Sequence, residues 1–260
     1  MPNVRVVSLV MLAVSSLVRV PQSNATPAEN TAETMFQIDF HVAEAALRPF
    51  IPDGWTLAVA TQGAIKDCNL RLDFIDRMAS VAADGSSGVK GPTQLVVLRV
   101  PVKQPNSDQI VQLVIGGLTA DASEAPGPFG VYKHADKHSM QRITSAEDGR
   151  RIKEQSTWSF SAATGENVQA HIEYERTGSR WASLEFGFIS ASDPTIRQKV
   201  RTDLGISDVW NANVPVEEGK VTKDVKYKLS GGVFGKLFDG TERVLSLDVF
   251  SWYLNKQVPN

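Results

Sequence analysis

Apolar side chains recur at every second position in many short segments of this chain, for example in residues 70–74, 96–100 and 168–174. Successive side chains of a β-strand point to opposite faces, so each segment suits a strand with one packed face and one face toward water or a lumen. Turn-forming pairs such as Asp239-Gly240 separate the segments. The pattern predicts about eight to ten strands arranged as an antiparallel barrel or sandwich.

Two segments have the features of a helix. In residues 42–50, apolar side chains recur three and four positions apart, which places them on one helical face. In residues 193–204, Asp193 can cap a helix, Pro194 suits its first position and Gly205 can end it. Because the remaining patterns are those of strands, the predicted fold class is mainly β with a few short helices.

Length and composition are those of an ordinary globular protein, with 260 residues of which 42% are apolar and 22% charged. A chain this long buries a sizeable core without disulfides or metal, and its one cysteine, Cys68, cannot form an internal disulfide. We interpret Cys68 as a small buried core residue. The formal net charge of −2 leaves no basic surplus for binding phosphates, so nucleic acid is excluded as a partner.

The first 25 residues differ in character from the rest. Arg5 precedes an apolar run over residues 6–18, and small residues before and at Ala25 suit cleavage. This is the layout of a secretory signal peptide, and the run is too short for a stable membrane anchor. We therefore predict a secreted or periplasmic protein with a signal peptide over residues 1–25, a linker over 26–35 and a single β-barrel domain over 36–260.

A long irregular segment over residues 119–138 is the place where we expect chemistry, because sites often lie on loops held by a rigid β scaffold. Near its end it concentrates titratable side chains: Lys133, His134, Asp136, Lys137 and His138. A lysine amine forms a Schiff base with a ketone or aldehyde when burial or a second cation lowers its pKa. Lys133 and Lys137 are both candidates for this role.

Two other interpretations of the same segment remain open. His134, Asp136 and His138 lie at alternate positions, so in a strand they would face one side and could approach a metal. The sequence singles out no fourth ligand, and we predict neither a metal nor a cofactor. The other alternative is a solvated loop whose charges serve solubility.

The order of several segments resembles the acetoacetate decarboxylase-like superfamily. The segment 40–55, FHVAEAALRPFIPDGW, resembles the helix and turn that open those proteins. Residues 99–102, RVPV, resemble the end of the strand before their catalytic hairpin, and residues 231–238 and 244–249 match in order. The similarity covers roughly residues 36–250.

The resemblance implies a closed antiparallel β barrel with a few short helices and a largely apolar interior site. In the decarboxylases, a lysine of lowered pKa forms an imine with a β-keto acid. Residues 130–133 are the nearest local match, which implies Lys133 as the catalytic lysine, whereas counting along the loop from Asp121 favours Lys137. The remaining residues implied to bind substrate are Gln94, Tyr132, His134 and His138.

The chain departs from the family where a Gly-Arg-Glu element is expected, since it has Ala125-Pro126-Gly127 there. We therefore expect an exported lyase that acts on a small carbonyl or β-keto acid through a Schiff-base lysine, with chemistry that has diverged from acetoacetate decarboxylation. The alternatives are a non-catalytic barrel that binds an apolar small molecule, and a structural module. Barrels of this kind often assemble through their outer faces, so a homo-oligomer is compatible with the resemblance.

Overall fold

The computed structural model describes residues 29–82, 86, 92–146, 152–176, 180–214 and 222–258. The predicted signal peptide, residues 1–25, lies outside this part of the chain. In the described part, no helix has both the length and the apolar character needed to cross a bilayer.

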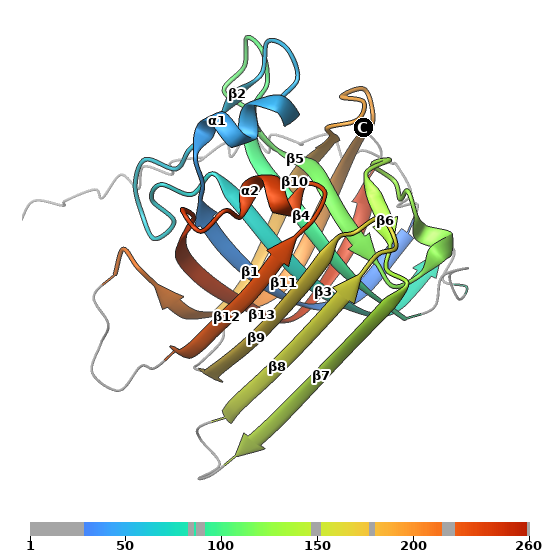
Figure 1. Ribbon diagram of the computed structural model, residues 1–260, viewed down its shortest axis with the longest axis vertical. Coiled ribbons are helices and arrows are strands. Elements are labelled where there is room, and N and C mark those ends of the chain that lie inside the picture. Colours follow the sequence, from blue (N-terminus) through green and yellow to red (C-terminus); the bar gives the residue numbers. More distant parts are fainter. Residues whose placement is uncertain are drawn as a thin grey trace, which may run out of the picture.

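Strands account for most of the described chain (Figure 1). In chain order the elements are β1 (Glu29–His41), α1 (Glu44–Leu47), η1 (Arg48–Phe50), β2 (Thr56–Leu57), β3 (Leu70–Ala82), β4 (Thr93–Lys103), β5 (Ile110–Thr119), η2 (Ala122–Glu124), β6 (Tyr132–His134), β7 (Lys137–Ala146), β8 (Ile152–Ser161), β9 (Asn167–Arg176), β10 (Arg180–Ser190), β11 (Arg197–Asn211), β12 (Thr222–Ser230), α2 (Phe234–Leu237) and β13 (Arg243–Val258). The helices are short, as predicted, and residues 42–50 contain α1 and η1.

The larger sheet closes on itself. Its strands run in the order β4-β3-β1-β13-β11-β10-β5, and an additional pairing between β4 and β5 joins the two ends into a barrel. The predicted closed β barrel is therefore confirmed. All junctions of the wall are antiparallel except that between β10 and β5, which is parallel and covers only residues 188–190 of β10.

The smaller sheet, β12-β9-β8-β7, forms a second layer across the outside of the barrel (Figure 1). Outward-facing aromatic rings of the barrel pack against its inner face. Trp158 of β8 is 1% exposed and meets Phe36 edge-on at 6.3 Å and Phe74 at 5.7 Å between ring centroids. Burial of these rings is a main source of the free energy that holds the two layers together.

The inward-facing side chains of β1, β3 and β4 form rows, because register pairs align every second residue across the three strands. In order along β3, the first row is Asp39, Arg71 and Arg99, the second Gln37, Asp73 and Val97, the third Met35, Ile75 and Leu95, and the fourth Glu33, Arg77 and Thr93. The first and fourth rows are polar and the third is apolar. This alternation places charges inside the barrel on either side of an apolar belt.

Two predictions of local structure are wrong. Residues 29–35, predicted as linker, belong to β1, where hydrogen bonding to both β3 and β13 outweighs their polar composition. The helix predicted over residues 193–204 is a tight turn followed by β11. The Asp193 carboxylate accepts from the backbone N–H and the hydroxyl of Thr195, so it stabilises the turn and not a helix.

Cys68 is 1% exposed, which confirms its interpretation as a buried residue. Burial, with a smaller effect of the nearby Asp39 carboxylate, raises the pKa of its thiol from 9.0 to about 12. Since the thiolate is the reactive form, we expect Cys68 of the folded protein to react with a disulfide reagent at pH 8 about a thousandfold more slowly than in the unfolded chain. A thiol assay with and without denaturant measures this, and equal rates would contradict a buried thiol.

The same shift has a consequence for stability. The thiol ionises more readily in the unfolded chain than in the folded protein. The contribution of the neutral thiol to the free energy of unfolding is therefore fully present below about pH 9 and is lost as the pH rises toward 12.

Candidate active site

The barrel encloses a cavity of about 480 Å³. Its lining combines an apolar wall with charged side chains from several strands. The polar lining residues are Thr31, Glu33, Gln37, Arg71, Asp73, Arg77, Arg99, Glu124, Tyr132, Arg180, Gln198, Thr202 and Asp248. The lining contains no lysine among the described residues. An apolar cavity with a few converging polar groups is the usual form of a small-molecule site.

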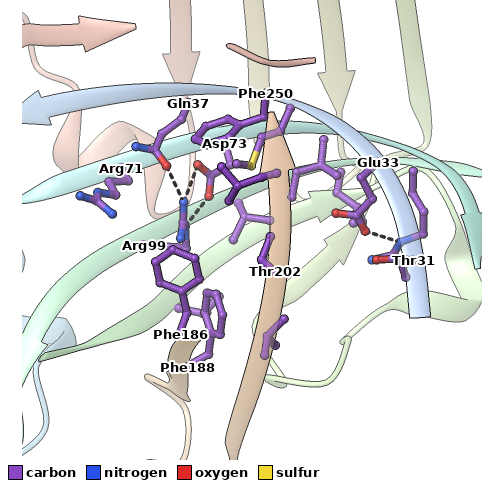
Figure 2. A pocket seen from close by; sticks show the side chains of 18 of the residues that line it. Thr31, Glu33, Gln37, Arg71, Asp73, Arg99, Phe186, Phe188, Thr202 and Phe250 are labelled. Atoms are coloured by element: carbon purple, nitrogen blue, oxygen red, sulfur yellow. Dashed lines mark hydrogen bonds and ion pairs between the residues drawn. The ribbon is translucent and has the colours of Figure 1, made fainter. Parts of the chain in front are cut away.

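Arg99 is the centre of the polar cluster at one end of the cavity. Its Nη2 donates to Asp73 Oδ1 at 2.8 Å and to Gln37 Oε1 at 2.9 Å, and its Nε forms an ion pair with the other Asp73 oxygen. Figure 2 shows these contacts as dashed lines. The guanidinium also lies 5.8 Å from the centroid of the Phe188 ring. Burial raises the pKa of Asp73, and the ion pair with Arg99 opposes that shift without cancelling it.

Arg71 lies beside this cluster and is held more loosely. Its Nε is 3.3 Å from Asp39 Oδ1, and Asp39 is also bonded by the Gln37 amide and the Ser246 hydroxyl. No hydrogen bond joins the terminal guanidinium nitrogens of Arg71 to a carboxylate of another described residue, and Figure 2 shows the side chain next to Gln37 and Arg99 without a dashed line. Although burial disfavours its charge, the Asp39 carboxylate raises the pKa of Arg71, so the guanidinium stays cationic.

Arg77 organises the polar groups at the other end. Its Nε donates to Glu33 Oε1 at 2.9 Å and its Nη1 to Glu124 Oε1 at 2.7 Å. Glu33 comes from β1 and Glu124 from η2, so this cluster ties the 122–124 turn to the barrel wall. Both carboxylates are buried and balance the arginine locally.

Tyr132 is one of the polar lining residues whose side chain has no hydrogen-bond partner in the described part of the chain; the Thr31 hydroxyl is another. The Tyr132 hydroxyl bonds to no other residue in the described part of the chain. Removal from water raises the pKa of this hydroxyl well above its usual value, with Arg77, Asp73 and Arg99 among the nearby charges. The group is therefore a neutral donor in the cavity at physiological pH.

Two glycines fix the position of the Tyr132 ring. A Cβ on Gly117, its partner across β5 and β6, would lie 2.6 Å from Tyr132 Cδ1 and 2.6 Å from the Val96 carbonyl oxygen. A Cβ on Gly127 would collide with the opposite edge of the ring, and Gly127 also has a φ of +74°. The close approach at both positions holds the ring in one orientation.

Lys133 does not line the cavity. It follows Tyr132 on β6, and successive side chains of a strand point to opposite faces. Its Nζ forms an ion pair with Glu166 in the turn between β8 and β9, and its side chain is 48% exposed. Partial burial raises the pKa of Glu166, but hydrogen bonds from Lys133 and Thr164 outweigh it and lower the pKa below its usual range.

The other predicted site residues also lie away from the cavity lining. Lys137 and His138 are exposed on β7, where the His138 ring stacks on Phe160 at 6.4 Å. Gln94 donates to Asp76 Oδ1 at 3.0 Å, on the outer face of β3 and β4. His134 Nδ1 is 3.9 Å from Asp136, and no group of three or more metal-ligating side chains is present among the described residues. Of the predicted set, the structure brings only Tyr132 into the cavity.

The arginines of the cavity were missed at the sequence level. Arg71 and Arg77 lie on the same face of β3 as Asp73 and Ile75, and this face enters the cavity. Because the two arginines do not interrupt the apolar face of the strand, nothing in the apolar pattern marks them as buried. The sequence signal that could have found them is the alternation of charge along the strand. Charged residues stand at positions 71, 73 and 77, on the face opposite Leu70, Leu72 and Phe74. A polar face of this kind fits a barrel lumen as well as it fits solvent.

Comparison with models of protein families and with curated proteins finds no match for this chain. Comparison with solved structures finds several matches. The enduracididine biosynthesis enzyme MppR complexed with pyruvate superposes with a TM-score of 0.54 at 12% identity, over 89% of this chain and 88% of that chain. MppR complexed with the condensation product of pyruvate and imidazole 4-carboxaldehyde gives 0.53 at 12% identity, over 89% and 87%.

An acetoacetate decarboxylase-like enzyme from Sphingomonas wittichii RW1 also matches, with a TM-score of 0.50 at 12% identity over 95% of this chain and 97% of that chain. The resemblance expected from the order of the segments is therefore confirmed at the level of the fold, which is the acetoacetate decarboxylase-like barrel in a divergent form.

Proposed function

We propose that the protein is a lyase-like enzyme that acts on a carbonyl compound carrying a carboxylate, bound inside the barrel. The observation that carries the proposal is the Tyr132 hydroxyl, a neutral donor without a protein partner in a cavity that also holds cationic Arg71. An unpaired donor in an apolar cavity is costly unless a ligand accepts its hydrogen bond. MppR, which has this fold, is described in complex with pyruvate, an acid with a carbonyl group.

The chemical role of Tyr132 follows from its ionisation state. A substrate carbonyl oxygen accepts the hydrogen bond of the Tyr132 hydroxyl, and Arg71 receives the carboxylate or another acidic group. When a bond next to the carbonyl breaks, as in decarboxylation of a β-keto acid, its electrons move onto the carbonyl oxygen as carbon dioxide leaves. The hydroxyl then stabilises the developing enolate, and solvent returns a proton to carbon. A donor already in place costs no reorganisation at that step.

A Schiff-base mechanism is the second form of this proposal and has a separate requirement. Lys133 must leave Glu166, or Lys137 must leave the exposed face of β7, for an amine to reach a carbonyl in the cavity. Borohydride reduction in the presence of ketones, aldehydes and β-keto acids, followed by peptide mass mapping, tests it. We expect no adduct on either lysine, and a stable adduct that is lost in Lys133→Ala would replace the tyrosine mechanism.

The proposal is tested by turnover. Purified protein is mixed with pyruvate, acetoacetate, phenylpyruvate and longer oxo acids, and substrate loss is followed by NMR. With a substrate in hand, Tyr132→Phe is expected to lower kcat by about 10²- to 10³-fold while changing the free energy of unfolding by less than about 1 kcal/mol, since the hydroxyl has no protein partner.

Tyr227→Phe is the matched control for that variant. The Tyr227 hydroxyl donates to Glu242 at 3.1 Å, and the residue does not line the cavity. Loss of the Tyr227 hydroxyl is expected to leave kcat unchanged. Equal activity of Tyr132→Phe and the unmodified protein would overturn the assignment of Tyr132.

A second candidate function is a non-catalytic carrier. The observation in its favour is that Arg77 and Arg99 are already balanced by Glu33, Glu124 and Asp73, which leaves an apolar wall as the main contact surface. Saturable binding without turnover of any member of the panel would favour the carrier.

Export is part of both proposals, and it depends on residues 1–25. Expression of the full chain with its own N-terminus, followed by fractionation and intact-mass measurement, tests export. The mature protein is expected to begin at Thr26.

A further inference from the structure

The cavity is larger than a three- or four-carbon acid requires. Its volume of about 480 Å³ falls in the range of roughly 300–1,000 Å³ that suits drug-sized ligands. A molecule of the size of pyruvate would leave most of the apolar wall in contact with water. The size alone indicates a ligand with a substantial apolar portion.

The distribution of polarity along the barrel indicates how such a ligand lies. Arg71 in the first row and Arg77 in the fourth are six residues apart on β3, about 20 Å along the strand. Between them the third row is apolar, and it continues into a single buried cluster of apolar side chains around the lumen: Met35, Ile75, Leu95, Val97, Val114, Phe129, Leu204, Ile206 and Phe250. A ligand that starts at Arg71 and extends along the barrel first passes the second row, where Gln37 and Asp73 are bonded to Arg99, and then meets hydrocarbon.

The cavity reaches the surface of the barrel beside β10. The segment of β10 from residue 180 to 187 pairs with β11 on one side and has no partner strand on the other in the described part of the chain. On this segment Leu184 both lines the cavity and is 42% exposed, so it lies at the opening. Phe186, two residues further along the strand, lines the cavity behind it. Leu184 and Phe186 thus give this part of the opening an apolar surface, and Arg180 lies on the same face four residues before Leu184.

We infer, on the basis of the proposed function, that the ligand is an organic acid whose apolar portion has roughly six or more carbons, either an alkyl chain or an aromatic group. Its acid group binds at Arg71, whose terminal guanidinium nitrogens bond to no carboxylate of another described residue. Its apolar portion lies along the third row and passes Phe186 and Leu184.

The test is calorimetric titration of the full folded protein with straight-chain carboxylates from butanoate to decanoate, and with octanol as the uncharged counterpart of octanoate. Each added methylene is expected to tighten binding about fourfold, from the transfer free energy of a buried methylene. Octanoate is therefore expected to bind at least a hundredfold more tightly than butanoate, with a binding heat capacity that becomes more negative along the series. Octanol is expected to bind more weakly than octanoate.

Three variants separate the parts of the inference. Arg71→Gln is expected to remove the advantage of octanoate over octanol. Leu184→Asp is expected to weaken octanoate binding at least tenfold, because it places a carboxylate at the apolar part of the opening. Leu254→Asp is the matched control, since Leu254 is 43% exposed on β13 and does not line the cavity. It is expected to bind octanoate as the unmodified protein does.

The outcomes distinguish this inference from the proposed function. Affinity that does not change with chain length, together with turnover of a short oxo acid, would overturn the inference and leave the enzyme in place. A steep dependence on chain length without turnover of any oxo acid would support the ligand class and favour the carrier. If Leu184→Asp and Leu254→Asp behave alike, the ligand does not pass β10 and the inference fails.

Discussion

Replacing Arg99 with methionine is expected to lower the free energy of unfolding by about 3–5 kcal/mol, because it leaves the buried Asp73 carboxylate without its cation. Arg99 bonds to both Asp73 and Gln37, and the Asp73 side chain is almost fully buried. Without the guanidinium, Asp73 must either stay charged in an apolar surrounding or take up a proton. Urea unfolding monitored by tryptophan fluorescence measures the loss.

The pH dependence of this variant has a definite sign. Burial already raises the pKa of Asp73, and loss of Arg99 raises it further. A carboxyl whose pKa is higher in the folded state destabilises the fold when it is ionised. The deficit of Arg99→Met relative to the unmodified protein is therefore expected to shrink as the pH falls from 7 toward 4.

Two controls make this prediction specific. Lys103→Met removes a cation from the same strand, but Lys103 is 3.5 Å from the fully exposed Asp108, and its loss is expected to cost less than about 1 kcal/mol. The double variant Arg99→Met/Asp73→Leu replaces the whole buried pair by apolar groups and is expected to recover most of the lost stability. Equal losses in Arg99→Met and Lys103→Met would contradict the buried ion pair.

Replacing Trp158 with alanine is expected to cost about 3–5 kcal/mol, the range for removal of a buried aromatic ring. The ring is 1% exposed between the barrel and the second sheet, where it meets Phe36, Phe74 and Phe160, and its Nε1 donates to Ser156. The cavity left behind would lie at the interface of the two layers. Thermal and urea unfolding of the variant measure the loss.

Trp181→Ala is the matched control for the same substitution. Trp181 is 63% exposed on β10, and its removal is expected to change the free energy of unfolding by less than about 1 kcal/mol. Comparable losses in the two variants would contradict the packing of the second sheet on the barrel. A Trp158→Ala variant that unfolds in two steps would show that this contact makes the layers one cooperative unit.

Much of the strand pattern could be predicted from local sequence. Side chains of a strand alternate between two faces whatever the strand packs against, so a strand with one buried face shows apolar residues at every second position. The alternation of Leu70, Leu72 and Phe74 with charged residues predicted β3 correctly. The prediction failed over residues 193–204, where a capping residue and a proline favoured a helix and pairing of β11 with β10 and β13 overrode them. Local propensities differ by about a kilocalorie per residue, so a strand bonded on both sides prevails.

The candidate site could not be predicted in the same way. The sequence placed Tyr132, Lys133 and His134 together in one interesting segment, but a strand separates neighbours to opposite faces. A shift of one residue decides whether tyrosine or lysine enters the lumen, and the two glycines against the Tyr132 ring decide it for tyrosine. The lumen also receives Arg71 from a face of β3 whose charges look, in the sequence, like those of a solvent-facing surface, and Arg99 from a face of β4 that is otherwise largely apolar.

The sequence by itself therefore determined the mainly β fold, the short helix over residues 42–50, the burial of Cys68 and the resemblance that the barrel fold confirms. These depend on the order of residues within a segment and on its apolar periodicity. Only the tertiary structure decided that β4 pairs with β5, that the charged faces of β1 and β3 enclose a cavity, and that Lys133 lies outside it. Closure of a sheet joins residues far apart in the chain, and local sequence does not distinguish a polar face toward a lumen from one toward water.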